Sequence, residues 1–512
     1  MKKILAIAML AFIITSCFKS NRNIYNVTDY GAANDGNTLT TAAIQKTIDE
    51  CARNGGGQVY VPNGNYLVGT LNLKSNVDFY MENGAVLVAT TDLSQYQIHN
   101  EQPAGIFYTE RATHVSISGN GKIFGQGMEF MYKDSAKVIG KDDCKYIRQK
   151  TDFRKVKEGL GDGPVYPKDR FHQMIIFSEC NDVTLSDFTC IDAPYWTFLI
   201  VHSENVEVRN LKIDNNLLIP NSDGLDVISC SNVNISDCNF SCGDDALVLA
   251  GYSTHYGDPG FKGILKPSTN INVNNCIFRS RSSAIRIGGW DQNHMSNYNL
   301  SNITIYDSNR GINLTVGDSG SIQNVNFNNI RIETRLHTGD WWGNGDPINI
   351  SAMRGVPNNP IGVIKNINFN NISCRSENGI MMYASDETKL SDITFSNFQL
   401  EIVKSPLEDV AGGNQDLRPN LIPEKGIFAC DIPALYIENG DNIFFNQTSI
   451  SWDGVEKKHY THALEAVNIK NLRISNTVAT SSPSNPGMPA VMLRNCSGFH
   501  TTETGLSIQK VN

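Results

Sequence analysis

Short runs of β-branched and aromatic residues alternate with polar residues along most of the chain, and an Asn or Asp opens many of these runs. Alternation with a period of two is typical of strands that bury one face. The recurring Asn residues favour tight turns, because Asn tolerates the left-handed backbone conformation. The pattern predicts many short strands separated by turns, as in Asn181-Asp182-Val183-Thr184-Leu185, Asn205-Val206-Glu207-Val208, Asn232-Val233-Asn234-Ile235 and Asn270-Ile271-Asn272-Val273.

The spacing of these runs indicates a repeat. Runs that start at 181, 205 and 232 are 24 and 27 residues apart, and the later intervals are wider. Numerous short strands without helical patterning between them favour a β-solenoid, in which each coil stacks on the last at the ordinary strand spacing. A β-sandwich is the alternative, but it predicts hairpin turns every 8–12 residues, about half the observed interval.

A single convincing amphipathic helix is expected over residues 41–51. Ala43 or Ile44, Ile48 and Cys51 follow a spacing of three to four residues. The glycines at 55–57 end the pattern. Since an uncovered last coil exposes both core and unpaired strand edges, we expect this helix to cap the solenoid.

Aspartates are concentrated in two short segments. In a solenoid, one period returns the chain above its starting point, and Asp223 and Asp244 are 21 residues apart. We therefore expect the two segments to be neighbours in space. Carboxylates held that close raise one another's pKa, and paired carboxylates are the usual means of cleaving a glycosidic bond. The segments are Asn221-Ser222-Asp223-Gly224-Leu225-Asp226 and Cys242-Gly243-Asp244-Asp245.

These motifs give the chain a family resemblance. It resembles glycoside hydrolase family 28, the polygalacturonase-like pectinases, from about Asn26 to Leu400. The resemblance rests on the two carboxylate segments and on three further stretches, Val27-Thr28-Asp29-Tyr30-Gly31-Ala32, Gly56-Gly57-Gln58-Val59-Tyr60-Val61-Pro62-Asn63-Gly64 and Asp192-Ala193-Pro194-Tyr195-Trp196.

The resemblance implies an all-β fold, a right-handed, single-stranded parallel β-helix with the N-terminal helix as its cap. It also implies inverting hydrolysis of an α-linked polysaccharide or oligosaccharide of the pectin type. Asp244 would be the general acid that protonates the leaving oxygen, while Asp223 and Asp245 would hold and activate the attacking water. An inverting enzyme needs one protonated and one ionised carboxyl with room for a water, and clustered carboxylates separate in pKa accordingly.

The sequence departs from the family around the substrate. Ser283 stands where the family has the His of Gly-His-Gly, and Asn313-Leu314-Thr315 stands where its Arg-x-Lys, which binds the galacturonate carboxylate, is expected. These changes put galacturonate specificity in doubt. Arginine offers bidentate contacts and Trp a surface for a sugar ring. The candidate substrate-binding residues are Asp226, Arg286, Trp290, His294 and Arg310.

No linker divides the chain, so residues 26–512 are expected to form one catalytic domain. Three stretches break the repeat, near 131–172, 336–361 and 405–426. The first is rich in Lys and Arg, and the second contains Trp341-Trp342. We expect them to be loop excursions that wall off one end of a groove, which favours exo-action.

The N-terminus has the pattern of a lipoprotein signal. Lys2 and Lys3 precede a short apolar run, and Ile14-Thr15-Ser16-Cys17 resembles a bacterial lipobox. This predicts a signal peptide over 1–16, lipidation of Cys17 and a tether over 17–25. An outer-membrane lipoprotein on the periplasmic side of the bacterial cell envelope is expected, because no acidic cluster follows the Cys. An ordinary signal peptide that happens to contain a Cys is the alternative.

Composition narrows the function classes. The net charge of −9 argues against a nucleic-acid partner. Eleven Cys remain after Cys17, many beside apolar runs, which favours buried thiols over a disulfide framework. No cofactor or metal is expected, and the protein is expected to act as a monomer. Two other functions remain open, a polysaccharide lyase whose acidic cluster binds calcium and a non-catalytic carbohydrate-binding solenoid.

Overall fold

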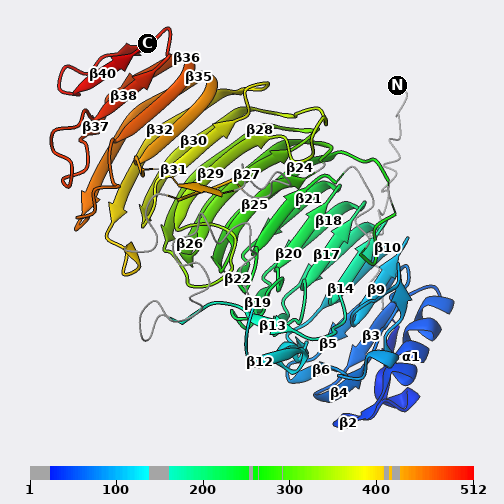
Figure 1. The fold of residues 1–512 in the computed structure, drawn as a ribbon. Coiled ribbons are helices and arrows are strands. Elements are labelled where there is room, and N and C mark those ends of the chain that lie inside the picture. Colours follow the sequence, from blue (N-terminus) through cyan, green and yellow to red (C-terminus); the bar gives the residue numbers. More distant parts are fainter. Residues whose placement is uncertain are drawn as a thin grey trace, which may run out of the picture.

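The computed structural model describes residues 23–137, 161–252, 258–262, 264–290, 292–408, 414–417, 427–429 and 431–512. Strands stack coil upon coil along one axis, from the N-terminal end with α1 to the C-terminal end with β40 (Figure 1). One sheet system joins 34 of the described strands, and its pairs are parallel. The predicted parallel β-helix is confirmed, and the sandwich alternative is wrong because a sandwich requires antiparallel hairpins.

One face of the stack positions the site described below. Each of its strands pairs in parallel with the strand one coil later. The strands are β9 (Phe107–Glu110), β14 (Ile175–Ser178), β17 (Phe198–Val201), β20 (Leu225–Ile228), β23 (Leu247–Ala250), β25 (Ser283–Trp290), β27 (Arg310–Gly317), β29 (Asp346–Met353) and β31 (Ile380–Ala384).

The other two faces begin as separate strands and merge from β24 (Ser268–Ser280) onward, where one long strand covers both. The merged strands bend where Asn adopts the left-handed conformation, as at Asn275, Asn302 and Asn329. The separate strands are β10 (Thr113–Ser118), β15 (Asn181–Ser186), β18 (Glu204–Arg209), β21 (Ser231–Ser236), β11 (Lys122–Phe124), β16 (Thr189–Ile191), β19 (Lys212–Asp214) and β22 (Asn239–Cys242). The merged strands after β24 are β26 (His294–Ser308), β28 (Ser321–Thr334), β30 (Val363–Ser376), β32 (Leu390–Val403) and β35 (Leu435–Asp453), before β36 (Leu464–Ser475), β38 (Val491–Arg494) and β40 (Ile508–Val511).

The core is a set of columns, because in-register strands place like residues above one another. Phe327, Phe369, Phe395 and Phe445 form one such column, and their rings stack at centroid distances of 4.8, 4.6 and 5.1 Å. Aliphatic columns run alongside, and they include Val206, Val233 and Ile271 on successive coils. Each fully buried side chain of this kind contributes about 1.5–3 kcal/mol.

Asparagines form matching columns on the outside. The side-chain amide of Asn326 donates to Asn299 Oδ1 at 3.0 Å, and that of Asn368 donates to Asn326 Oδ1 at 3.0 Å. The column that includes Asn302 and Asn329 repeats the arrangement at the bends. The Asn pattern of the sequence therefore reports both left-handed turns, as predicted, and ladders of amide hydrogen bonds between coils.

The expected capping helix is present as α1 (Thr41–Arg53), which buries Ile44, Ile48 and Cys51. It covers the first coils at the N-terminal end of the stack (Figure 1). The elements around it are β1 (Ile24–Asn26), η1 (Val27–Tyr30), β2 (Asp35–Leu39), β3 (Gly57–Val61), β4 (Gly64–Val68), β5 (Val77–Met81) and β6 (Ala85–Ala89).

Antiparallel pairs outside the main sheet system mark two of the three stretches that the sequence predicts to be excursions. β12 (Met131–Ala136) and β13 (Val165–Pro167) pair in antiparallel fashion at the base of the first, and β33 (Asn414–Asp416) and β34 (Ile427–Ala429) pair likewise in the third. The remaining short elements are η2 (Leu93–Gln95), β7 (Ile98–His99), β8 (Gln102–Pro103), η3 (Gly127–Phe130), β37 (Val478–Ala479) and β39 (His500–Thr501). Residues 138–160, 409–413 and 418–426 of the predicted excursions lie outside the described residues, as do residues 1–22, which include the predicted signal segment and Cys17.

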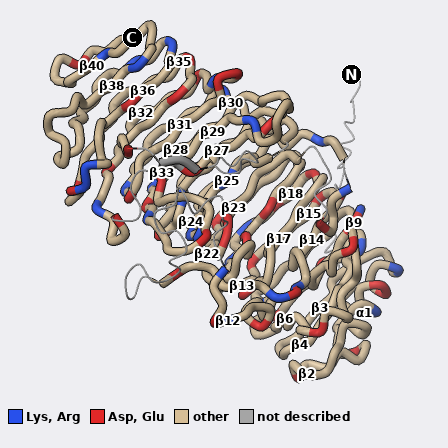
Figure 2. The backbone as a smooth tube through the Cα atoms, viewed as in Figure 1, with Lys and Arg blue, Asp and Glu red and all other residues tan. Residues whose placement is uncertain are grey.

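Basic residues (Lys and Arg) and acidic residues (Asp and Glu) are interspersed along the stack (Figure 2). Among the described residues, no helix has the length and apolarity needed to cross a membrane. Nine cysteines in this part of the chain have free thiols, eight of them buried, in agreement with their predicted role in the core.

Candidate active site

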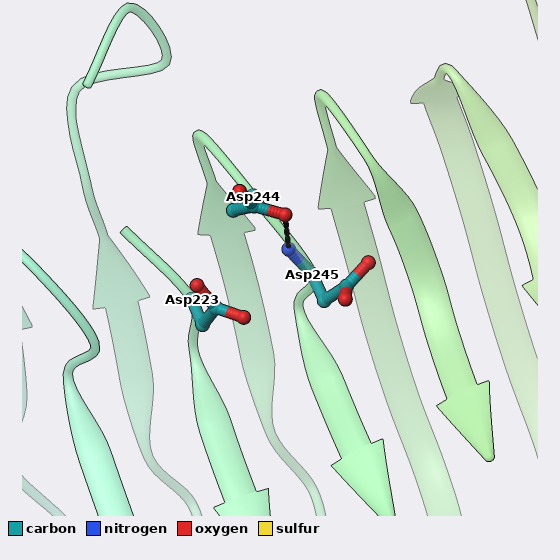
Figure 3. A group of neighbouring side chains, drawn as sticks. All are labelled: Asp223, Asp244 and Asp245. Atoms are coloured by element: carbon teal, nitrogen blue, oxygen red, sulfur yellow. Dashed lines mark hydrogen bonds between the residues drawn. The ribbon is translucent and has the colours of Figure 1, made fainter. Parts of the chain in front are cut away.

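Asp223, Asp244 and Asp245 meet at one corner of the stack, where the chain turns into β20 and β23. The register pairs Leu225 with Leu247, so Asp223 lies beside Asp245 on the next coil. One carboxylate oxygen of each aspartate lies within 4.8 Å of the others, and the three side chains converge in Figure 3. The structure thus brings together all three predicted catalytic carboxylates, and the in-register neighbour of Asp223 is Asp245, one residue beyond the expected Asp244.

The close approach of the two segments depends on Gly243. Its backbone N–H donates to Ser222 Oγ at 3.0 Å, and the Ser222 hydroxyl donates to Ile219 O at 2.9 Å. A Cβ at Gly243 would lie 2.4 Å from Ile219 O and 2.6 Å from Ser222 Oγ. No side chain fits there without moving the segment that carries Asp223.

Burial raises the pKa of two of the three carboxyls, Asp223 and Asp244. Burial and then the charge of Asp245 raise the pKa of Asp244 to about 6. Burial and then Asp244 raise the pKa of Asp223 well above its ordinary value. Two backbone N–H groups bind Asp244, from Asn221 to Oδ2 at 3.2 Å and from Asp245 to Oδ1 at 3.0 Å. A carboxyl that titrates near 6 is suited to donate a proton near neutral pH.

Asp245 accepts hydrogen bonds from a backbone N–H group and from a guanidinium cation. The backbone N–H of Ser283 donates to its Oδ1 at 2.8 Å, and Arg286 Nη1 donates to its Oδ2 at 2.9 Å. Arg286 Nη2 also donates to the Tyr252 hydroxyl at 2.6 Å. Arg286, predicted to bind substrate, therefore lies in the pocket with its guanidinium turned to a carboxylate of the protein.

A pocket of about 850 Å³, its open mouth included, lies over the carboxylates. Trp290 and Trp342 form one wall and meet edge to face, with ring centroids 6.3 Å apart at 78°. Trp342 comes from the 336–361 stretch, so this stretch contributes to the pocket wall. Asn313 and Thr315, the residues at the family's Arg-x-Lys positions, line the pocket beside Tyr252.

The other predicted substrate-binding residues are placed differently. Arg310 lines the pocket, but its guanidinium is ion-paired with Asp346 at 2.7 Å and Asp416 at 3.5 Å. Asp226 is fully buried and does not line the pocket, and burial raises its pKa well above the ordinary value. His294 lies at the start of β26, its ring Nδ1 is 3.0 Å from Ser321 Oγ, and it does not line the pocket.

Arg170 is a residue that sequence reasoning missed. Its Nη1 donates to Pro194 O at 2.6 Å and to Pro220 O at 2.8 Å, and its guanidinium lies 4.7 Å from the Tyr195 ring centroid. It therefore ties together the two turns that precede the carboxylates. Burial lowers the pKa of Arg170 to about 10. The basic composition of the first excursion was the only signal for it.

The carboxylate cluster is also an oxygen-only donor set of the kind that a hard cation prefers. However, Arg286 and backbone N–H groups bind the oxygens of Asp244 and Asp245. Arg286 already supplies a positive charge beside Asp245. The three carboxyl groups therefore fit proton transfer better than they fit metal ligation.

The comparisons with known proteins agree with this geometry. A family model described as Glycosyl hydrolases family 28 matches residues 51–410. A probable polygalacturonase of Vitis vinifera is 25% identical over 332 residues, and the match covers 60% of this chain and 60% of that protein. An exopolygalacturonase of Zea mays is 26% identical over 285 residues, covering 52% of this chain and 62% of that protein. The chain thus matches about 60% of the length of these curated relatives.

Solved structures share the fold. A hyperthermoactive exopolygalacturonase from Thermotoga maritima superposes with a TM-score of 0.57 at 21% identity, over 74% of this chain and 87% of its own. A family 28 exopolygalacturonase from Yersinia enterocolitica gives 0.63 at 18% identity, over 88% of this chain and 78% of its own. At these identities the structures support the β-helix alone, whereas the family model covers more than half of the chain. The chain therefore belongs to glycoside hydrolase family 28.

Proposed function

We propose that this protein is a glycoside hydrolase that cleaves an α-linked saccharide of the pectin type by inversion. The observation that carries the proposal is the corner of three buried aspartates, Asp223, Asp244 and Asp245, at the floor of an open pocket. Membership in glycoside hydrolase family 28 and polygalacturonase relatives support the substrate class.

The roles follow from the surroundings of each carboxyl. Asp244 is the general acid, because burial keeps it protonated up to a pH of about 6. Asp245 is the base, because an N–H group and a guanidinium bind its anionic form. Asp223 lies beside Asp245 on the preceding coil and orients the water between them.

The stereochemical outcome needs its own measurement. The nearest carboxylate oxygens lie within 4.8 Å of one another, while inverting enzymes commonly separate the two carboxyl groups by roughly 6.5–9.5 Å and retaining enzymes by roughly 5–5.5 Å. Inversion here rests on the family resemblance of the two carboxylate segments. Proton NMR of the first-formed product should show the anomer opposite to the substrate linkage, and the same anomer would indicate a retaining enzyme.

The decisive test is a panel of pectic and other plant or algal oligosaccharides with D244N as the blank. Loss of the general acid is expected to lower kcat by about 100- to 10,000-fold. Asp214→Asn is the matched control, since Asp214 is an exposed aspartate at the end of β19, away from the pocket. Equal turnover by D244N and the wild type would refute the catalytic proposal and favour the carbohydrate-binding solenoid.

We also propose exo-action. The excursion that carries Trp342 encloses one side of the pocket, and several relatives have names that specify exopolygalacturonase activity. Digestion of a long pectic chain should release only the terminal unit from the earliest time point. A ladder of intermediate oligomers would contradict exo-action and leave hydrolysis intact.

The lyase alternative has a distinct signature. A lyase would yield an unsaturated, ultraviolet-absorbing product and lose activity in a chelator if calcium occupied the acidic corner. Hydrolysis predicts a saturated product and activity unaffected by chelation, because the proposed acid and base are side chains.

We propose, finally, that the chain is a monomeric envelope lipoprotein anchored through Cys17 with its body on the periplasmic side. The lipobox-like segment of the sequence supports this. Incorporation of labelled fatty acid that is lost in Cys17→Ser would establish the anchor, and light scattering of the soluble body would give the oligomeric state. Protease protection in intact cells would separate the periplasmic face from the surface.

A further inference from the structure

Arg286 lies one coil beyond Asp245 on the face that carries the pocket. It belongs to β25, where the register places Ser283 next to Asp245 and Arg286 next to Val248. Its side chain reaches back across this coil boundary, with Nη1 on Asp245 Oδ2 at 2.9 Å and Nη2 on the Tyr252 hydroxyl at 2.6 Å. Both ends of the guanidinium fork are thus engaged by groups of the protein.

The charged groups around this pair come from several elements. Asp223 and the buried Asp226 lie on the preceding coil, and Asp244 precedes Asp245 directly. Two other cations interact electrostatically with this corner. Lys137, which follows β12, interacts with Asp244, and Arg170 interacts with Asp223 and Asp244. Lys137 is itself paired with Asp340 at 3.3 Å, and Arg170 is bound to backbone carbonyls. Arg286 is the cation in direct contact with a catalytic carboxylate among these residues.

We propose that Arg286 is a positioning residue for the base, which fixes Asp245 in its anionic form and orientation, and that it is not a clamp for a carboxylate of the substrate. The proposal rests on the hydrolytic function proposed above. A guanidinium that donates one hydrogen bond to a carboxylate and a second to a phenol is held in a single orientation. Turning it toward a sugar would break both contacts and leave a buried carboxylate without its counter-ion.

The electrostatics of the corner agree with this assignment. Arg286 lowers the pKa of Asp223, Asp226 and Asp244, against the effect of burial in each case. Without its charge, these three carboxyls would keep their protons to a higher pH.

The kinetic test compares R286Q, R286K and Y252F with the wild type on the substrate found in the panel. We expect R286Q to lower kcat by about 100-fold, with little change in KM, since a positioned general base contributes about that factor. The acidic limb of kcat/KM should move to higher pH in R286Q and return toward the wild-type position in R286K, which keeps the charge. Y252F should move the limb in the same direction by a smaller amount. A raised KM with kcat preserved would identify a substrate clamp and overturn the proposal. A loss of activity on substrates with free carboxylates, but not on their methyl esters, would do the same.

A second test does not depend on turnover, so it separates this proposal from the proposed function. Thermal unfolding of R286Q should show a lower midpoint than the wild type, because the buried Asp245 carboxylate loses its counter-ion. Adding Asp245→Asn should recover most of that deficit, since the amide leaves no charge unpaired. An equal deficit with and without Asp245→Asn would show that Arg286 has no coupling to the base, even in a variant that still hydrolyses the substrate.

Discussion

Burial and charge set the chemistry of individual residues at the corner of the stack. Asp244 shares its surroundings with two other aspartates, yet backbone N–H groups hold its orientation while its pKa rises to about 6. Asp245, one residue on, faces Arg286. Adjacent residues of the same type thus suit the opposite roles that we propose for them, because one lies toward the buried carboxylates and the other toward a cation.

The alkaline limb of the pH profile should report Asp244. The general acid must be protonated, so kcat/KM is expected to fall as the pH rises through about 6. Lys137 lowers the pKa of Asp244 by its charge, and K137Q should therefore move this limb to higher pH. An alkaline limb that stays in place in K137Q, measured against Lys133→Gln as the control, would assign it to another group.

Asp226 should reduce stability at neutral pH. Its folded-state pKa is raised above the unfolded value of about 3.9, so the folded state loses stability as the pH rises above that value. The isosteric change D226N should raise the unfolding midpoint at pH 7 and leave it nearly unchanged at pH 4. KM should change little, since Asp226 does not line the pocket. A lower midpoint at pH 7 would show that the Asp226 charge is compensated.

At the scale of strands and turns, the exposed Asn columns do two jobs that a matched pair of variants can separate. Asn326 and Asn329 both lie in ladders of amide hydrogen bonds, but only Asn329 adopts the left-handed conformation, with φ of 55°. N326A should cost about 0.5–1.5 kcal/mol from lost hydrogen bonds. N329A should cost about 1–2 kcal/mol more, because Ala resists that conformation.

Asn329→Gly checks the cause. Glycine adopts the left-handed conformation freely, so it should recover most of the extra loss while the ladder bonds stay absent. Thermal unfolding midpoints of N326A, N329A and N329G, measured side by side, separate the backbone effect from the loss of hydrogen bonds. Equal losses in N326A and N329A would assign the whole effect to the ladders.

The excursion that carries Trp342 should supply affinity more than rate. Trp342 meets Trp290 edge to face at the pocket wall, where the two rings offer a surface for a sugar. W342A is expected to raise KM about tenfold, equivalent to about 1.4 kcal/mol, with kcat nearly unchanged. Trp452→Ala is the control, since Trp452 donates to Thr480 O far from the pocket. A fall in kcat alone would place Trp342 in the chemistry.

Across the whole molecule, the features that follow from the repeat could be predicted from the sequence. Alternation gave the strands, the Asn spacing gave the turns, and the period placed Asp223 near the Asp244 segment. The use of Arg286 and Arg310 could not be predicted in this way, because alternation shows which side of a strand a residue faces but not which group its side chain binds. Arg310 pairs with Asp416, which lies 106 residues away in another excursion. Periodicity has no information about where such loops land, so the residues best placed by sequence are those that lie on the coils themselves.

The cap is expected to stabilise the stack without tuning the site. Ile48 is a fully buried residue of α1 itself, several coils from the carboxylates. I48A should cost about 2–5 kcal/mol. Because the coils between the cap and the pocket remain paired, kcat at 25 °C should match the wild type. Unfolding midpoints measure the loss of stability, and initial rates measure kcat. A fall in kcat in I48A would mean that the capped end of the stack and the pocket are tightly coupled.

The register that sets Asp223 beside Asp245 and Asp245 beside Ser283 has an evolutionary consequence. Backbone hydrogen bonds fix those neighbours, whereas Trp342 and the partners of Arg310 come from segments that leave the ladder. Surface segments tolerate insertion and deletion far better than paired strands do. Under the proposed function, exchange of such loops can therefore change how the pocket holds a saccharide while the spacing of the three carboxylates stays fixed.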